Sequence, residues 1–365
     1  MNVVIVLNWC AAKETIECVN SILGGCPDID LVCVVDNCSP DGSMDVLTEW
    51  LQSKRNDTNS IMLVKNSENS GYAGGNNFGL RKVLERFHSV ENFWLFNNDA
   101  YVKEDAFGPL LDVLAEDSKA ICGSVVLSSK DDTLECFGGG LLYPLLGKAR
   151  LLGKGKSLSG LGAIGLPDYI MGCSMAFSRK LLDEVGFMDE SYFMYSEEID
   201  WQFRAREKGF YIAVADNSII YHHGSMSSGG RGAFYHFYRN RAAIMFNKKF
   251  YGARFALLSA AILSLITLSQ ELIHPSVALA GIRGAFAGLK ENFYLGDKTE
   301  LLTSILSNSM ASFSYVVTPN VNHVVQINHS PELRAAYADA SFRVCDSKVL
   351  QPILSFFSVN IKEAI

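Results

Sequence analysis

The sequence lacks several features that would each indicate a particular class of protein. It has no excess of basic residues, since 32 Lys and Arg stand against 39 Asp and Glu, so a general nucleic-acid binder is not expected. Its nine cysteines are scattered and form no C-x-x-C pair, which argues against a disulfide framework and a zinc site. The N-terminus has no basic segment with a cleavage site, so no signal peptide is expected. What remains is a globular chain, 48% hydrophobic and 19% charged, that we expect in the cytoplasm.

Short apolar runs alternate with predicted helices through the first hundred residues. This alternation is typical of an α/β protein with a mostly parallel sheet and helices on both faces. The predicted strands are 3–7, 31–35, 61–64 and 93–96, and the predicted helices are 15–23, 43–52 and 78–87. Later segments are less regular. We expect a flexible loop over the site at 138–165, a strand interrupted by Gly172 at 168–177, and an edge strand at 219–225 after a short strand at 211–215.

Polar side chains follow the predicted strands where each strand ends. In a parallel sheet these ends share one edge, and ligands bind there. The residues expected at this edge are Asn8, Asp36, Asn37, Asn97, Asn98 and Asp99. The segment 66–77, rich in Gly and Asn, precedes a predicted helix, so its backbone could approach a phosphate closely. The candidate phosphate contacts in that segment are Gly71, Gly74, Asn76 and Asn77.

Three carboxylates within four residues, Glu197, Glu198 and Asp200, open a helix predicted at 199–208. The positive end of the helix dipole favours ionised acids at this place, so an ordinary acidic helix start is one interpretation. A positioned, ionised carboxylate is also what a general base needs. The polar strand ends that converge on one edge favour the second interpretation.

A divalent metal site is a further hypothesis. Asp99 follows one predicted strand, and the pair His222 and His223 ends another. Imidazole and carboxylate together suit a divalent ion, although simple packing is the usual role of a histidine. Arg239 and Arg241, on a helix that follows, supply the positive charge that an anionic ligand would need in an acidic protein.

The chain resembles the family 2 inverting glycosyltransferases of GT-A fold, and especially their bacterial rhamnosyltransferase-like branch. The matching segments, within about residues 1–250, are VVIVLNW, VVDNCSPDGS, NSGYAGGNN, FWLFNNDAYV, DYIMGCSMAF, GFMDESYFMYSEEIDWQFR, YHHGS and FYRNR. The resemblance implies a dTDP- or UDP-sugar donor, rhamnose being the guessed sugar, and a Mg²⁺ or Mn²⁺ ion. It also implies a saccharide acceptor, expected to be lipid-linked, in cell-surface polysaccharide biosynthesis.

The resemblance assigns roles to individual residues as well. It places the catalytic base on Glu198, with Asp200 second and Glu197 as support, and the metal on Asp99 with His222. The residues it implies for the donor are Asn8, Asp36, Asn37, Asn97 and Arg239, and those for the acceptor are Asp168, Gly172 and Trp201.

Two departures from the family pattern keep a second function open. The familiar Asp-x-Asp is Asn97-Asn98-Asp99, and the usual Glu-Asp pair is Glu197-Glu198. A longer side chain shifts the base, and a misplacement of about 1 Å can cost roughly a hundredfold in rate. The alternative is therefore a catalytically weak sugar-nucleotide-binding scaffold of a polysaccharide assembly complex. A Rossmann dehydrogenase is a distant third, because no G-x-G-x-x-G follows the first strand.

The remainder of the chain changes character twice. The segment 255–269 is uncharged, but it is shorter than a membrane-spanning helix, which needs about 20 residues. An interfacial helix pair at the inner face of the plasma membrane and a hairpin packed on the catalytic domain are equally expected. From about residue 297 the chain resembles the opening of the WecG/TagA/CpsF glycosyltransferases, with Thr318, Asn320 and Asp346 at matching positions. That domain is expected to be incomplete, inactive alone, and poorly ordered or self-associating. The expected domains are 1–250, 251–296 and 297–365.

Overall fold

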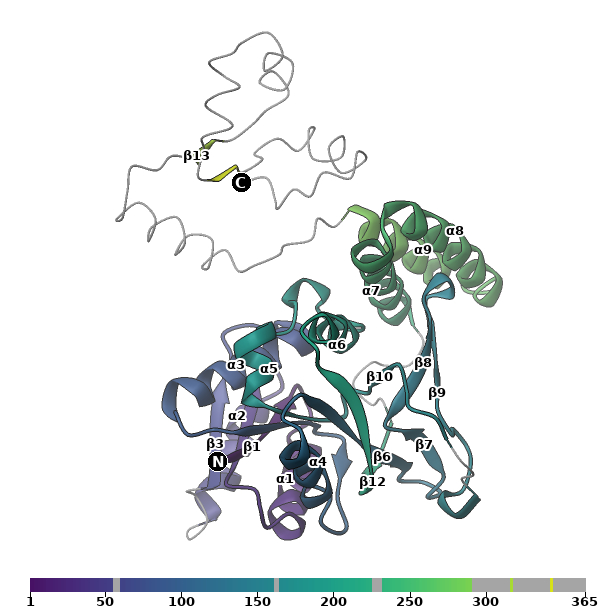
Figure 1. The fold of residues 1–365 in the computed structure, drawn as a ribbon. Helices are drawn as coiled ribbons and strands as arrows, with labels where there is room; N and C mark the ends of the chain where they lie inside the picture. The colour runs from purple at the N-terminus through teal and green to yellow at the C-terminus, as the bar shows by residue number, and fades with distance from the viewer. Residues whose placement is uncertain (55–59, 161–163, 225–231, 291–315, 318–341, 344–365) are drawn as a thin grey trace.

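The computed structural model describes residues 1–54, 60–160, 164–224, 232–290, 316–317 and 342–343. The strands of the main sheet are β1 (Asn2–Asn8), β2 (Leu31–Asp36), β3 (Ile61–Lys65), β4 (Asn92–Asn97), β5 (Ala100–Tyr101), β6 (Ala120–Ser128), β7 (Leu134–Phe137), β11 (Ser174–Ser178) and β12 (Tyr211–His222). The helices on this sheet are α1 (Ala12–Gly25), α2 (Ser43–Ser53), α3 (Gly71–Arg86), α4 (Gly108–Glu116), α5 (Arg179–Val185) and α6 (Glu197–Glu207). The predicted α/β fold is confirmed (Figure 1).

The main sheet is mixed, with the strand order β3-β2-β1-β4-β11-β6-β12-β5 and with β7 paired to β6. Strands β1 to β4 are parallel as predicted, whereas β11 runs antiparallel between β4 and β6. The strands predicted after residue 210 are confirmed as strand, but their separation and the edge position are wrong. They form the single strand β12, which pairs with β6 inside the sheet, because a register shift between Ala215 and Ile219 lets the strand continue.

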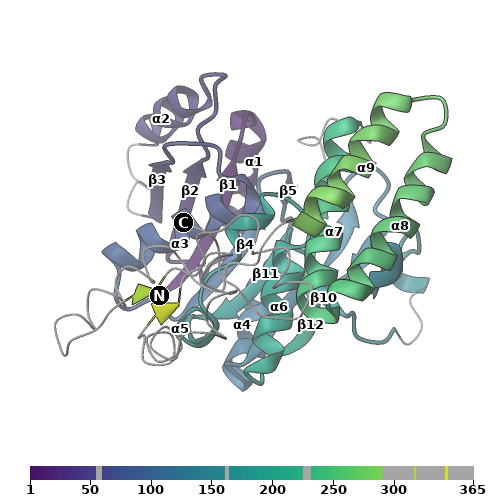
Figure 2. The same ribbon diagram turned by 90° about the horizontal axis from the view of Figure 1, so that it is seen from above.

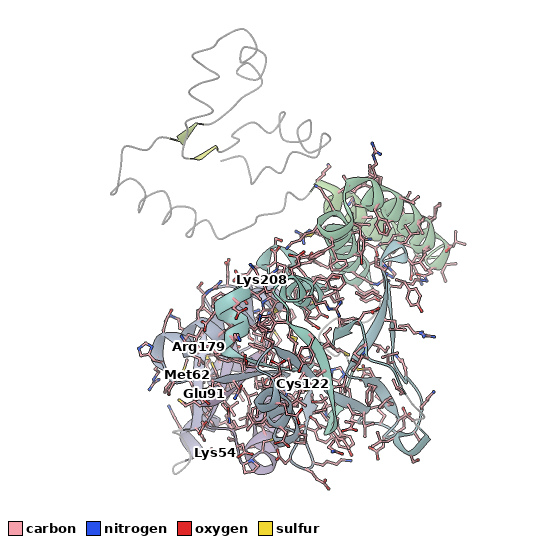
Figure 3. All side chains as sticks on the ribbon, in the orientation of Figure 1. Lys54, Met62, Glu91, Cys122, Arg179 and Lys208 are labelled. Atoms are coloured by element: carbon pink, nitrogen blue, oxygen red, sulfur yellow. The ribbon has the colours of Figure 1, made fainter. Side chains whose placement is uncertain are left out.

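The sheet is buried on both faces. Val4 and Val6 of β1 pack with α1, α2 and α4, while Val3 and Ile5 pack with α3, α5 and α6. All four side chains are fully buried, as an unbroken β-branched run predicts for a central strand. Side chains fill the space between the layers, with Cys122 of β6 inside the domain and Lys54 at its edge (Figure 3).

Helix α3 begins at Gly71 rather than at Phe78, so the predicted Gly/Asn loop is largely helical. Its glycines permit close packing. A Cβ on Gly71, whose φ is +72°, would lie 2.0 Å from the carbonyl oxygen of Phe193, and one on Gly75 would lie 2.5 Å from a methyl of Leu7. These glycines therefore bring α3 against β1 and against the chain before α6.

The predicted flexible loop at 138–165 is instead a hairpin. It consists of β8 (Gly139–Tyr143), the turn η2 (Pro144–Leu146) and β9 (Lys148–Leu151), and β8 also pairs with β10 (Tyr169–Ile170). A further turn, η3 (Leu158–Gly160), follows β9. The apolar tip explains the difference, because it packs on the helices that follow. The predicted strand at 168–177 is likewise divided at Gly172 into β10 and β11.

Three helices stand together beside the sheet: α7 (Ala233–Tyr251), α8 (Ala253–Gln270) and α9 (Pro275–Lys290) (Figures 1 and 2). Gly284 lets α9 approach α7 closely, since a Cβ there would lie 2.1 Å from the carbonyl oxygen of Phe237. Helix α8 is long and apolar enough to cross a membrane by length and composition alone. In the tail, β13 (Val316–Val317) and β14 (Phe342–Arg343) pair in parallel. The predicted positions Thr318, Asn320 and Asp346 lie outside the described residues.

Candidate active site

The chain turns sharply just before the acidic helix. Phe193, Tyr195 and Ser196 have positive φ angles of 64°, 72° and 66°. Non-glycine residues in this region cost about 1–3 kcal/mol each and persist only where other contacts hold them. Here the carbonyl of Phe193 accepts a hydrogen bond from the backbone of Tyr72 (2.8 Å), and its ring packs on Tyr238 of α7 (4.9 Å). Helices α3 and α7 thus fix where α6 begins.

Asp200 holds this helix in place. It is fully buried, and its oxygens form ion pairs with Arg204 (2.8 Å) and with Lys249 of α7 (2.6 Å). Tyr192 donates a further hydrogen bond to it (3.1 Å). Lys249 also reaches Asp189 (3.1 Å). With both oxygens engaged, Asp200 is suited to anchor α6 on α7 and poorly suited to accept a proton from a substrate.

Glu198 differs from its two acidic neighbours. It is half-buried, and no side chain in the described ranges donates a hydrogen bond to it. Burial raises its pKa to about 7, although the backbone N–H groups of Glu198 and Ile199 lower it in part. Glu197 is almost fully buried, and burial together with the charge of Glu198 raises its pKa well above the ordinary value. Of the three, Glu198 has the exposure and the pKa of a general base at neutral pH.

The metal hypothesis rests on Asp99 and His222. Both are buried, and Asp99 Oδ1 lies 3.2 Å from His222 Nε2, yet neither atom has a hydrogen-bond partner in the described part of the chain. On the other side of the ring, His222 Nδ1 lies 2.8 Å from Glu135 Oε2. A carboxylate behind a histidine orients it as a metal ligand. These two buried atoms contact each other and have no further hydrogen-bond partner among the described residues, and such a carboxylate–imidazole pair fits a divalent cation.

Charges around this pair are tightly coupled. Burial disfavours the protonated ring of His222, but contacts with Asp99 and Glu135 outweigh it and raise its pKa to about 10. Burial likewise raises the pKa of Asp99, and the contact with His222 lowers it below the ordinary value. Among the described residues no group of three or more His, Cys, Asp or Glu could hold a metal. An ion here would therefore take its remaining ligands from a diphosphate and water, which Mg²⁺ and related ions commonly accept.

Tyr72 connects the metal side with the acidic helix. Its hydroxyl donates to the carbonyl of Gly172 (2.6 Å). Burial raises its pKa well above the ordinary value, and the negative charges of Glu198, Glu197 and Asp99 add to that rise. The carboxylates of α6 and Asp99 are therefore both within electrostatic reach of this one side chain.

The strand-end residues of β1 and β2 form a buried network. Asn8 donates to Asp36 (2.8 Å), and Thr15 donates to Asn8 (2.8 Å) while accepting from Asn98 (3.0 Å). The backbone of Ser39 donates to Asp36 (3.1 Å). Asn8 and Asp36 are both fully buried, so they fix the shape of this edge of the sheet.

Asn37 and Asn97 lie at the same edge. Asn37 donates to the carbonyl of Gly71 (3.0 Å) and accepts from Asn66 (3.1 Å), so it holds the start of α3. Asn97 is half-buried, and its side chain contributes to the lowered pKa of Asp99. The structure thus brings together, at the ends of three strands, the residues predicted to bind the sugar donor.

The polar side chains of the Gly/Asn segment have partners inside the fold, and phosphate contacts at Gly71, Gly74, Asn76 and Asn77 stay a prediction. Asn76 donates to a carbonyl of the preceding turn (3.0 Å), and Asn77 exchanges hydrogen bonds with the backbone of Met188 (2.9 and 3.1 Å). Both side chains are buried, and a Cβ on Gly74 would lie 2.6 Å from Ser70. These residues pack α3 against its neighbours because their polar groups find partners inside the fold.

The three residues predicted to contact the sugar acceptor lie in different surroundings. Gly172 faces Tyr72 beside Glu198, where a Cβ would lie 2.9 Å from the tyrosine hydroxyl. Asp168 accepts a hydrogen bond from the backbone of Leu142 (2.7 Å) and so holds the β8–β9 hairpin. Trp201 is fully buried in the core and donates to the carbonyl of Gly186 (2.7 Å), so a role toward the acceptor stays a prediction.

The two arginines of α7 have partners inside the fold. Arg239 donates to the carbonyl of Gly147 (2.5 Å) at the tip of the hairpin, and Arg241 donates to the carbonyls of Ser191 (2.9 Å) and Tyr192 (3.1 Å) in η4 (Glu190–Tyr192). These bonds join α7 to the hairpin and to the turn before α6. A role of Arg239 toward a donor stays a prediction.

Sequence reasoning missed three residues of this site. Glu135 orients His222, Lys249 anchors Asp200, and Tyr72 lies between the two clusters. Each contact joins residues distant in the sequence, and no local pattern signals it. Of the three, only Tyr72 could have been found from the sequence, because it lies within the Gly/Asn segment that was predicted to approach a phosphate.

Comparisons with known proteins identify the family and the fold. Residues 3–186 match the model of glycosyl transferase family 2, and residues 290–365 match that of the glycosyl transferase WecG/TagA/CpsF family. The low-salt glycan biosynthesis hexosyltransferase Agl10 of Haloferax volcanii is 26% identical over 216 residues, which are 57% of this chain and 62% of that protein, so the chain spans less than two thirds of this relative.

A solved structure shows the same fold. The crystal structure of GalNAc-T7 with UDP, GalNAc and Mn²⁺ superposes with a TM-score of 0.53 at 12% identity, covering 70% of this chain and 50% of that one. The family 2 match takes in half of the sequence, with β1 to β4, Asp99 and β11 inside it. The chain belongs to glycosyl transferase family 2.

Proposed function

We propose that the chain transfers a sugar, with inversion, from a nucleotide-diphosphate donor to a hydroxyl group of a saccharide acceptor. The observation that supports this proposal is that Tyr72 lies within electrostatic reach of both Glu198 and Asp99, and that Asp99 pairs with His222. One side offers a carboxylate that can accept a proton, and the other offers two buried atoms that suit a cation bound to a diphosphate.

The reaction proposed is a single in-line displacement. The acceptor hydroxyl attacks the anomeric carbon, its proton passes to Glu198, and the nucleoside diphosphate leaves with the bonding electrons. Mg²⁺ or Mn²⁺ held by Asp99 and His222 would supply stabilisation of the negative charge that develops on the leaving group. Glu135 keeps the His222 ring oriented for that purpose, and Asp200 keeps the helix of the base in place.

The comparisons support the coarser part of this proposal. The relative Agl10 is described as a hexosyltransferase of glycan biosynthesis, and GalNAc-T7 was crystallised with UDP and Mn²⁺. We propose the finer part from the resemblance alone: a dTDP- or UDP-sugar donor such as a rhamnose donor, and a lipid-linked acceptor in cell-surface polysaccharide synthesis. The proposed catalytic unit is 1–250, followed by 251–296 and by the WecG/TagA/CpsF-like segment 297–365.

The test is a screen of the full chain against UDP-, GDP- and dTDP-sugars with Mg²⁺ or Mn²⁺ and a saccharide on a lipid diphosphate. We expect acceptor-dependent release of the nucleoside diphosphate with one donor class. Glu198→Gln should abolish release while donor binding persists. If a donor binds but no condition yields release, the chain is a binding scaffold and the proposed enzymatic function is wrong.

A further inference from the structure

Helix α8 exposes a continuous apolar face on the side away from α7. Its inner side chains, among them Ala256, Ala260 and Leu263, are buried. On the opposite side Leu257, Leu258, Leu265 and Leu268 are exposed, with 67% of Leu265 accessible to solvent. At 100° per residue these four positions lie on one face of the helix. Between Arg254 and Gln270 that helix contains no charged residue.

The apolar surface continues past the end of α8. Leu272 and Ile273 in the turn to α9 are 72% and 83% exposed, and α9 adds Leu279 and Phe286. We call these eight exposed residues the α8–α9 face: Leu257, Leu258, Leu265, Leu268, Leu272, Ile273, Leu279 and Phe286. Soluble monomers rarely expose large apolar patches, and such patches mark interaction sites.

The charges around this face have one sign. Residues 253–290 contain three cations, Arg254, Arg283 and Lys290, and a single acid, Glu271. Glu271 lies 3.2 Å from the buried His236 and is therefore engaged. The chain as a whole carries a net charge of −7, so this positive region is a local exception.

The β8–β9 hairpin extends the positive region. The hairpin carries two exposed cations, the segment after β9 carries two more, and residues 138–167 contain no acid. None of these cations forms an ion pair with a residue that the structure describes; they are Lys148, Arg150, Lys154 and Lys156. The tip of the hairpin is attached to α8, where the hydroxyl of Ser259 donates to the carbonyl of Leu145 (3.0 Å). Figure 1 shows β8 and β9 reaching up to the three helices.

Helix α8 is held on the protein by polar contacts along its inner side. Asn247 of α7 donates to Ser259 (2.8 Å), and Asn240 donates to Thr267 (3.0 Å). These buried contacts would be lost if α8 left α7 to cross a bilayer, and unpaired polar groups in hydrocarbon are costly. The geometry therefore suits a helix that lies in the membrane interface rather than one that spans it.

We propose that the α8–α9 face, together with the basic β8–β9 hairpin, docks on the surface of a bilayer rich in anionic lipid. Leucine side chains would enter the headgroup boundary, and the cations would contact lipid phosphates. This docking deepens the proposed function. It rests on that function in one respect: a lipid-linked acceptor in the membrane surface is the reason for the enzyme to bind there. The surface itself is argued from exposure and charge.

The test is flotation of the full chain with vesicles of phosphatidylcholine alone or with about 30 mol% phosphatidylglycerol, which gives the vesicle a negative surface. We expect binding to the anionic vesicles that weakens with salt. Leu257→Gln with Leu265→Gln should reduce binding at least about tenfold, because each leucine contributes buried apolar area. Lys148→Gln with Arg150→Gln should reduce it about fivefold per cation and flatten the salt dependence.

Matched controls are Val46→Gln, an equally exposed apolar residue on α2, and Lys13→Gln on α1, both of which should bind as the wild type does. Turnover of a water-soluble acceptor without vesicles should be unchanged in all four variants, so loss of docking is separable from failure of the proposed function. Absence of vesicle binding by the wild type overturns the proposal. So does a dimer that Leu265→Gln dissociates, which would assign the face to a second copy. Protection of α8 from amide exchange by residues 291–365 would overturn it as well.

Discussion

Replacement of Glu198 by Gln tests the proposed base most directly. The pKa of Glu198 is about 7, so at pH 6 about 9% of the side chain is ionised and at pH 8 about 91%. If the ionised form is the base, kcat/KM of the wild type should rise about tenfold between pH 6 and pH 8, with a midpoint near 7. Glu198→Gln should lower kcat by about a hundredfold to ten-thousandfold and remove this dependence, since general-base catalysis contributes that much.

The same pKa makes a prediction about stability. The folded chain binds the Glu198 proton more tightly than the unfolded chain does, because the folded pKa is about 7 and the ordinary value is 4.5. The free energy of unfolding contributed by this group therefore falls as pH rises from 4.5 to 7. Glutamine cannot ionise, so Glu198→Gln should be more stable than the wild type at pH 8 and no more stable at pH 4.5. Urea unfolding at the two pH values measures this difference.

Glu197→Gln is the matched control. Burial and the charge of Glu198 hold the pKa of Glu197 well above its ordinary value, so the charged form is disfavoured and the neutral amide should preserve most of the rate. Nucleoside diphosphate release, followed in the same buffer series for the three proteins, gives the comparison. An active Glu198→Gln would refute the assignment of the base, and an inactive Glu197→Gln beside it would move the assignment to Glu197.

Three further predictions concern the surroundings of the base. Asp99→Asn should weaken Mn²⁺-dependent donor binding at least about tenfold, as titration calorimetry would show, whereas unchanged binding would exclude Asp99 as a metal ligand. Asp200→Asn should lower the free energy of unfolding by about 3 kcal/mol, because it removes the buried charge that pairs with Arg204 and Lys249; a loss below about 1 kcal/mol in urea titration would contradict the anchoring role. Gly71→Ala should cost at least about 2 kcal/mol, because its Cβ would meet the carbonyl of Phe193; wild-type stability would show that this contact is not needed.

Local pattern accounts for much of the fold. The β-branched run of β1 predicts a strand buried on both faces, and the helices α1 and α2 lie close to their predicted positions. The hairpin at 138–165 was predicted as a loop because glycines and lysines are frequent there. It forms strands since its apolar tip packs on α7 and α8, a contact with residues about a hundred positions away. No window of local sequence contains that information.

The candidate site divides in the same way. The identity of its chemical groups was determined by the sequence: carboxylates at the start of α6, and Asp99 and His222 after strands. Which carboxylate is free was decided by tertiary structure, because Lys249 arrives from a helix 49 positions later and engages Asp200. The roles of Trp201 and Asn77 were decided there too, since burial gives their polar groups internal partners. A residue's chemistry is local, but its exposure and partners depend on the whole fold, and these select the group that can react.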